Sequence, residues 1–335
     1  METQVTVNKR GITGTGLKII ALIAMFIDHV AAVLLTDYLA PRYAPDFLTN
    51  EDMQLWISTH PKLVFLNALM VCMRLIGRFG FPLFAFLIVE GFIHTRSVVK
   101  YALNLGIFAI ISELPFNLAF ISKLFYPHYQ NVFFTLFLGL LCMTCMKNFS
   151  EKCRDKKGCV PLFYLAGLLL GAFIGYLLFN DFFFLAAFIR LETVPKYIAV
   201  AVCAVISLII FSVLGMKWDV AKKNVFTFHV LPLVVLCMMG EVLHTDYGAG
   251  GVLTIATMYM LRANKTKAFN FGCIVLTLMS PSEVTAFLML IPVSMYNGQR
   301  GMKLNKYFFY AFYPVHLGLI YLLTLLLGFT TFALR

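Results

Sequence analysis

Three ionisable residues interrupt apolar stretches of the sequence, where a charge is costly. Asp28 and His29 lie well inside the first apolar run, and His316 lies inside the last. A charge at bilayer depth costs at least about 2.5 kcal/mol, so each is a functional candidate. Neutral imidazole takes up a proton near pH 7 and suits a general base. We therefore take His29, Asp28 and His316 as candidate catalytic residues; a purely structural hydrogen-bonded pair is the alternative.

Helix geometry separates the roles of the neighbours Asp28 and His29. Successive residues lie about 100° apart around a helix, so the two side chains cannot point the same way. With His29 as the base, Asp28 is expected to orient a neighbour such as an arginine or His316. Both imidazoles lie near the midplane of a hydrocarbon core of about 30 Å, where they can share a cavity.

A second set of polar residues is expected at the opposite membrane face. Arg74 and Arg78 are four residues apart and share one helical face. Glu113 and Asp246 lie at matching depth, and unpaired charges there would be costly, so we expect one polar cluster beside an acceptor entrance. The alternatives are snorkelling of the arginines, capping of broken backbone by Glu113, and a simple turn at Asp246.

The elements that position these residues must be membrane-spanning helices. The chain of 335 residues is 61% hydrophobic and 13% charged, against about 25% charged in soluble domains. This composition excludes a soluble globular protein and a disordered one. We predict an all-α polytopic helical bundle of about 10 to 11 transmembrane helices, forming one domain over residues 1–335. The predicted spans are 17–38, 79–95, 98–121, 131–147, 160–180, 196–216, 226–243, 249–262, 268–296 and 307–329.

Three details qualify these spans. The run 268–296 is broken at Pro281, which suggests two short crossings joined by a turn. Residues 62–74 are expected to form a short helix leading into the second span. The stretch 182–189 is apolar but too short to cross.

Basic residues set the expected orientation. Lys and Arg outnumber Asp and Glu by 27 to 16, a formal net charge of +11. They concentrate in alternate loops, as in cytoplasmic loops of membrane proteins, so we predict an integral plasma-membrane protein with a cytoplasmic N-terminus. No basic patch interleaved with stacking aromatics points to nucleic acid. Most cysteines lie inside apolar runs, and Cys142 with Cys145 is only a weak metal or redox motif, so no metal is expected.

Several segments together resemble the TraX family. They are Leu17 to His29, Arg74 to Thr95, Ser112 to Phe116, Asn131 with Phe134 to Leu136, Thr245 to Gly248, and Phe309 to His316. The resemblance is close over residues 17–146 and looser over 241–320, whereas 150–235 depart from it as extra or divergent helices. The Asp-His pair and the Phe- and Pro-containing second span are also similar to the wider group of transmembrane acyltransferases.

This resemblance implies an integral membrane acetyltransferase. TraX is linked to acetylation of the pilin N-terminus, and the wider group implies cytoplasmic acetyl-CoA and an extracytoplasmic acceptor. The acceptor is then a peptide N-terminus or a cell-surface sugar. Arg74 and Arg78 would face the acceptor side, where they orient an anionic acceptor or hold Glu113. His29 would act as the base, and the oxyanion donors would be His316, Tyr313 or Asn131. The CoA phosphates would meet cytoplasmic cations. Those cations are Arg96, Lys100, Arg262, Lys265, Arg300 and Lys303.

Two other functions remain open at this point. One is a proton-coupled transporter or flippase in which Asp28, His29 and Glu113 form a proton relay. The other is a structural membrane partner without chemistry. Stabilisation of the purified protein by CoA discriminates the enzyme from both, because a ligand that binds only the native state must stabilise it.

Overall fold

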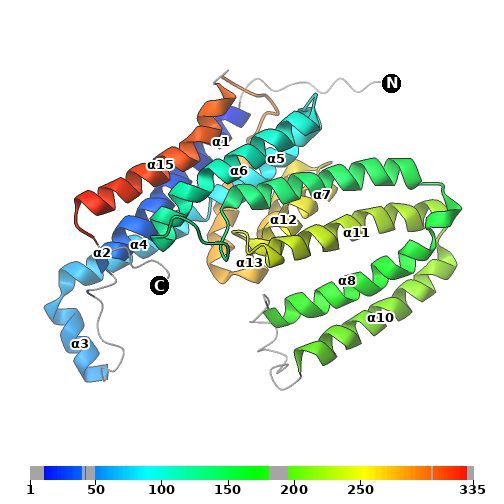
Figure 1. Ribbon diagram of the computed structural model, residues 1–335, viewed down its shortest axis with the longest axis horizontal. Coiled ribbons are helices and arrows are strands. Elements are labelled where there is room, and N and C mark those ends of the chain that lie inside the picture. Colours follow the sequence, from blue (N-terminus) through cyan, green and yellow to red (C-terminus); the bar gives the residue numbers. More distant parts are fainter. Residues whose placement is uncertain (1–10, 40–41, 43–49, 181–194, 303–304, 330–335) are drawn as a thin grey trace.

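The computed structural model describes residues 11–39, 42, 50–180, 195–302 and 305–329 (Figure 1). Apart from two isolated bridges, every regular element among these residues is a helix. This confirms the predicted all-α polytopic fold. The helices are α1 (Gly14–His29), η1 (Val30–Leu35), α2 (Thr36–Leu39), α3 (Asn50–Thr59), α4 (Pro61–Gly77), α5 (Gly80–His94), α6 (Val98–Ile121), α7 (Val132–Cys153), η3 (Lys157–Cys159), α8 (Pro161–Asn180), α10 (Lys196–Lys217), α11 (Val220–Val242), α12 (Gly248–Met260), α13 (Lys265–Met279), η5 (Pro281–Met289), α14 (Leu290–Ser294) and α15 (Lys306–Leu326).

Eight helical segments in the described residues are long and apolar enough to cross a membrane. The second runs over Pro61–His94 and joins the expected lead-in helix to the second span, with a turn at Arg78. The long run 268–296 divides at Ser280, as predicted: α13 ends there, and η5 with α14 packs back against it. The stretch 182–189 lies outside the described residues.

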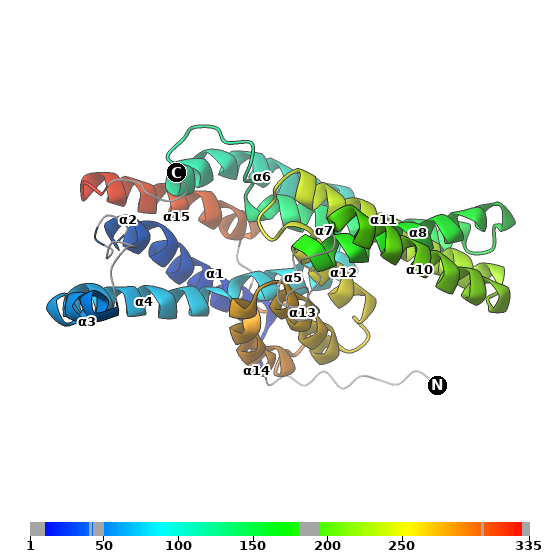
Figure 2. The same ribbon diagram turned by 90° about the horizontal axis from the view of Figure 1, so that it is seen from below.

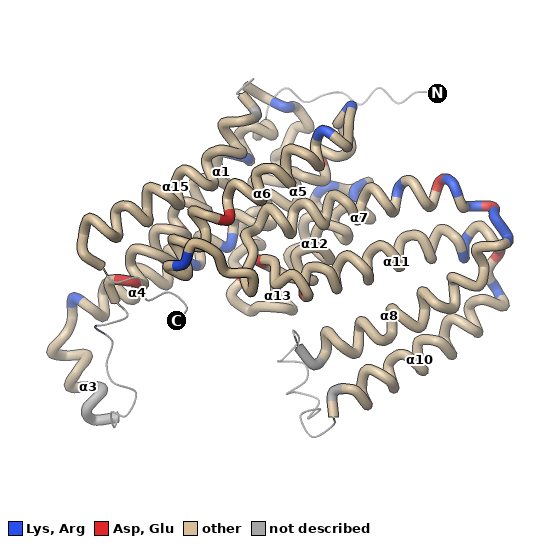
Figure 3. Tube along the Cα trace, in the orientation of Figure 1, with Lys and Arg blue, Asp and Glu red and all other residues tan. Residues whose placement is uncertain are grey.

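Lys and Arg gather along one edge of the molecule (Figure 3). We call this edge the basic end. It is formed by the start of α1, the turns at 94–100, 147–157, 217–223 and 262–267, and the segment 295–302. Segment 295–302 is tied to the start of α1, because Gly14 N–H donates to Gln299 O at 2.8 Å and Thr15 N–H donates to Arg300 O at 2.9 Å. These bonds fix Arg300 beside α1.

Helices α5 and α12 form the centre of the bundle, whereas α8 and α10 form a hairpin at its edge (Figures 1 and 2). Most of α5 is buried between α1, α7, α12 and α13. Helix α12 packs closely on α7, where a Cβ on Gly139 would overlap the side chain of Ile255. This packing holds the start of α5 next to α1, where the ionisable residues lie.

Two loops opposite the basic end reach into the bundle. Asn131, the N-cap of α7, donates from Nδ2 to the carbonyl of Ala109 at 2.8 Å, and Ala109 lies near the midpoint of α6. Loops 122–131 and 243–247 are joined there by a parallel bridge between Gln130 and Thr245. The two loops are therefore joined to each other and held against the middle of α6.

Candidate active site

The first candidate residue lies where a helix changes type. Helix α1 begins at an N-cap, Thr13, whose hydroxyl accepts the N–H of Gly16, and it ends at His29. The next six residues, Val30–Leu35, form a π-helix. Short π-helical segments are rare and often occur at functional sites, because they change the direction in which a side chain points. His29 is thus held at the junction of two helix types.

His29 and His316 form a direct pair between α1 and α15. Nδ1 of His29 lies 2.6 Å from Nε2 of His316, and the ring planes are parallel to within 1°. Nδ1 of His316 lies 2.6 Å from the carbonyl oxygen of Phe312. Both side chains are buried, at 9% and 4% exposure. The structure therefore brings the two candidate imidazoles together, and both nitrogens of His316 are occupied.

Asp28 points to α4, as expected for a residue that orients an arginine. Its carboxylate lies 2.6 Å from Arg74 and 3.6 Å from Arg78. The two helices approach closely here, because a Cβ on Gly77 would overlap this carboxylate. The Asp28 ion pairs thus connect α1 to the second span.

Arg78 has a second partner that the sequence did not predict. Its guanidinium lies 3.0 Å from Glu283, whose residue is only 2% exposed, and Thr285 donates to Leu75 O at 2.9 Å beside it. The Pro281 break was the available signal, since it places an acidic residue at a turn. Sequence alone does not show that this turn packs against α4. We call Asp28, Arg74, Arg78 and Glu283 the arginine cluster.

The prediction that Glu113 and Asp246 pair with Arg74 and Arg78 is wrong, because both carboxylates have other partners. Glu113 accepts hydrogen bonds from the backbone N–H of Asn131 at 3.0 Å and from its side-chain amide. Asp246 accepts from the hydroxyl of Tyr129 at 3.2 Å. Among the described residues neither carboxylate forms an ion pair with an arginine. Glu113 instead holds the start of α7 against α6.

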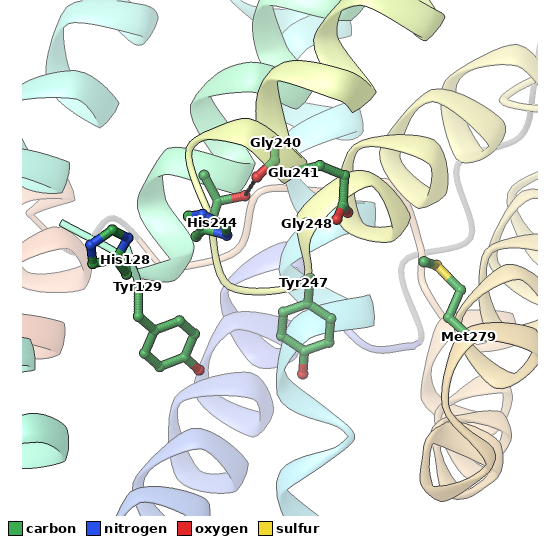
Figure 4. Close-up of a pocket in the computed structure, with 9 residues that line it drawn as sticks. His128, Tyr129, Gly240, Glu241, His244, Tyr247, Gly248 and Met279 are labelled. Atoms are coloured by element: carbon green, nitrogen blue, oxygen red, sulfur yellow. Dashed lines mark hydrogen bonds between the residues drawn. The ribbon is translucent and has the colours of Figure 1, made fainter. Parts of the chain in front are cut away.

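A pocket of about 340 Å³ lies on the side opposite the basic end (Figure 4). We call it the outer pocket. Its polar side chains come from the two joined loops and the end of α11, and Tyr129 and Tyr247 extend in the same direction from those loops. Tyr129 also bonds Asp246, so the pocket lies directly beside this carboxylate. The lining residues are His128, Tyr129, Gly240, Glu241, His244, Thr245, Tyr247, Gly248 and Met279.

A larger cavity of about 610 Å³ opens at the basic end. We call it the basic-end cavity. Its cations are Lys18 of α1, Arg96 and Lys100 at the start of α6, and Arg300. Tyr313 is among its inner lining residues, and the ring of Tyr313 lies edge-on to His29 at 5.6 Å between centroids. The cavity therefore runs from a cationic mouth to the wall beside the histidine pair.

The six basic residues predicted to bind phosphates lie in different places in the structure. Arg96, Lys100 and Arg300 line the basic-end cavity. Lys265 is paired with the cavity residue Glu90 at 2.9 Å. Arg262 does not line this cavity and lies over the ring of Tyr259, so its role as a phosphate ligand stays a prediction. Lys303 lies outside the described residues. Lys18 was missed, although its position one turn into α1 was a usable signal.

The described part of the chain contains no group of three or more His, Cys, Asp or Glu side chains arranged to hold a metal ion. Cys142 is buried in α7 and Cys145 is partly buried, and neither is disulfide-bonded. The histidine pair itself can support acid–base chemistry, because a neutral imidazole carries one N–H donor and one bare nitrogen that accepts.

The close approach at Gly77 gives a first prediction. Replacing Gly77 with alanine is expected to displace the Asp28 carboxylate and to lower the free energy of unfolding by about 1–3 kcal/mol, as overpacking does. The matched control is Gly318→Ala in α15, where nothing lies within 4 Å of the added Cβ. Thermal unfolding in detergent should show a lower midpoint only for Gly77→Ala; equal midpoints would contradict the tight α1–α4 contact.

Comparison with known proteins supplies the remaining observation. The chain matches the family model described as TraX protein over residues 13–234 and 204–324. It is 33% identical over 135 residues to the probable fimbrial assembly protein FimC, serogroup H1, of Dichelobacter nodosus. That alignment covers 38% of this chain and 43% of the relative, so it spans less than half of either. No solved structure matches the chain.

Proposed function

Because the chain belongs to the TraX family, which is linked to pilin acetylation, we propose that it is an integral membrane acetyltransferase. In this proposal the acetyl group moves from acetyl-CoA at the basic end to an amine or hydroxyl of an acceptor that enters from the opposite side. The observation that carries it is the basic-end cavity, which joins a cationic mouth to the wall beside His29.

The cationic mouth suits the phosphates of CoA. Four cations line the cavity, and CoA carries about four negative charges on its diphosphate and 3′-phosphate. Arg96 and Lys100 flank the first turn of α6, whose unpaired N–H groups favour an anion. Basic loops favour the cytoplasmic side, so the N-terminus is proposed to be cytoplasmic, in the plasma membrane. The pantetheine arm would then carry the thioester inward along the cavity.

His29 is the proposed base. As the acceptor nitrogen or oxygen attacks the thioester carbonyl carbon, His29 takes the proton from the breaking N–H or O–H bond. The C–S bond then breaks, and the same proton passes to the sulfur of CoA. The acetylated acceptor and CoA thiol are the products, so no other reactant is needed.

Of the three residues considered as oxyanion donors, Tyr313 is the one that can still donate, because its hydroxyl oxygen accepts the backbone N–H of Val132 and leaves the O–H for another acceptor. Both nitrogens of His316 are occupied. The side-chain amide of Asn131 donates to Ala109 and Glu113, and its oxygen accepts the N–H of Phe133. Tyr313 is 3% exposed, lies in the cavity wall next to His29 and carries a hydroxyl donor. We propose that its hydroxyl donates a hydrogen bond to the thioester oxygen and stabilises the negative charge that develops there.

The outer pocket is the proposed acceptor entrance. It lies at the two joined loops, and Asp246 and the arginine cluster are close to its tyrosines. The name of the fimbrial relative favours a pilin-like peptide as acceptor over a cell-surface sugar. A proton-coupled transporter is disfavoured, because among the described residues Glu113 bonds Asn131 and Asn117 rather than Asp28 or His29.

The donor site gives a second prediction. Charge reversal at Arg96, Lys100 or Arg300 is expected to raise the KM for acetyl-CoA about tenfold or more with a smaller change in kcat, because these groups hold remote phosphates. Binding should also weaken with salt. The matched control is Arg154→Glu, a basic-end residue that does not line the cavity. Unchanged donor KM in all three reversals would contradict the cytoplasmic-donor site.

The function itself is tested by reconstituting the purified protein in vesicles with acetyl-CoA and candidate acceptors. Peptides with free N-termini and cell-surface sugars are supplied in parallel, and mass spectrometry measures acetyl gain. Acetylation that requires both acetyl-CoA and the protein supports the proposal. Movement of an ion or substrate without any acetyl transfer supports the transporter instead.

A further inference from the structure

We propose that His316 is a positioning residue that fixes the tautomer of His29, so that Nε2 of His29 is the nitrogen that takes the proton. The assignment of the tautomer stands on hydrogen bonds alone, while the role of Nε2 as base rests on the proposed acetyl transfer.

The assignment starts at the carbonyl oxygen of Phe312. A carbonyl oxygen only accepts, so the Nδ1 of His316 that lies 2.6 Å from it must carry a hydrogen. Neutral histidine has one N–H and one bare nitrogen. Nε2 of His316 is therefore an acceptor.

The same reasoning locates the hydrogen on His29 in the first span. Nδ1 of His29 lies 2.6 Å from Nε2 of His316, and the parallel rings suit a hydrogen bond in the ring planes. Because Nε2 of His316 accepts, Nδ1 of His29 must donate. Nε2 of His29 then carries no hydrogen, and none of the described residues forms a hydrogen bond with it.

The opposite arrangement would require a charged His316. Its Nε2 would donate only if the ring were an imidazolium, a buried cation at the depth where charge is costly. The rings packed on the pair are aromatic: Phe26, Phe120, Phe312 and Tyr313. The charged residues of α4 nearest to this level, Arg74 and Arg78, are paired with Asp28 and Glu283. Asp28 is turned to those arginines and does not contact the pair.

In this arrangement His316 also stabilises the protonated form of His29, which a purely structural contact would not do. When His29 takes the acceptor proton at Nε2, its Nδ1–H already donates to His316. The resulting positive charge is stabilised through that bond and, beyond it, through the Phe312 carbonyl. Loss of the bond would let His29 adopt either tautomer, and the tautomer with hydrogen on Nε2 has no base in the reacting position.

The direct test is nitrogen NMR of the full chain labelled with ¹⁵N-histidine in lipid vesicles. The chain has only 7 histidines, so His29→Ala and His316→Ala variants assign both rings. We expect His29 and His316 each to carry hydrogen on Nδ1 and none on Nε2. A His29 with hydrogen on Nε2 would overturn the assignment.

A kinetic test uses two replacements of His316. Gln can accept from His29 through its side-chain oxygen, so His316→Gln is expected to retain turnover within about tenfold of the wild type. His316→Leu cannot accept, so kcat should fall about 10²-fold or more, with acetyl-CoA KM unchanged and with both His29 tautomers visible by NMR. The control is His229→Leu in α11, whose Nδ1 also lies near an i−4 carbonyl.

The outcomes separate the two proposals. Equal loss of turnover in the Gln and Leu variants, or wild-type turnover in His316→Leu, would overturn the positioning role. A wild-type protein that transfers no acetyl group would overturn the proposed function, and the NMR spectrum would still decide the tautomer.

Discussion

Replacing His29 with alanine is expected to lower kcat for acetyl transfer by about 10²- to 10⁴-fold, the usual contribution of a general base. His29 lies at the α1–η1 junction, edge-on to Tyr313 in the wall of the basic-end cavity. Because acetyl-CoA is proposed to bind through phosphates remote from His29, its KM should change little. Acetyl release measured with isotope-labelled acetyl-CoA in vesicles checks both parameters.

The matched control for this variant is His229→Ala, since His229 is a histidine in a spanning helix that lies away from the cavity. Size-exclusion profile and unfolding midpoint show that each variant is folded. Full turnover in a folded His29→Ala protein would exclude His29 as the base. Equal losses in both variants would point to a general structural effect.

Replacing Arg78 with methionine is expected to have the largest effect on stability. Arg78 is 17% exposed and contacts two carboxylates, Glu283 at 3.0 Å and Asp28 at 3.6 Å. Removing one partner from a buried ion pair leaves an uncompensated charge, which costs about 3–5 kcal/mol. The free energy of unfolding in detergent should fall by that amount. The double variant Arg78→Met, Glu283→Gln should recover part of the loss, because it removes the orphaned charge of Glu283.

An exposed ion pair of the same chain provides the comparison. Lys222 lies 3.8 Å from Asp219 and the two side chains are 69% and 61% exposed. Lys222→Met should change the free energy of unfolding by no more than about 1 kcal/mol. If Arg78→Met costs as little as Lys222→Met, Arg78 is a boundary anchor that snorkels, and the arginine cluster does not hold α1, α4 and η5 together.

The sequence predicts the fold well, because membrane spans are set by apolar length. The split of the run 268–296 follows from Pro281, which cannot continue a helix, and α13 and η5 do separate there. The equal depth of His29 and His316 in two spans allows them to meet, although it does not show that α1 and α15 pack together at this point. Depth is readable from the chain because every residue of a helix adds about 1.5 Å.

The sequence does not predict in the same way which spans pack against each other. Depth alone offered Glu113 as a partner for Arg78, but Glu113 faces the start of α7, and Glu283 is the residue that contacts Arg78. Arg262 and Lys18 show the same limit at the basic end. Both lie near turns of the basic end, and only the packing of the helices decides that Lys18 lines the cavity and Arg262 does not.

The central claim is that acetyl-CoA enters the basic-end cavity with its thioester beside His29. Determining the structure of the full chain with a non-reactive thioether analogue of acetyl-CoA tests this most directly. We expect phosphate density against Lys18, Arg96, Lys100 and Arg300, and the acetyl group between Tyr313 and Nε2 of His29. An analogue bound elsewhere on the protein, or an empty cavity at saturating analogue, would contradict the claim.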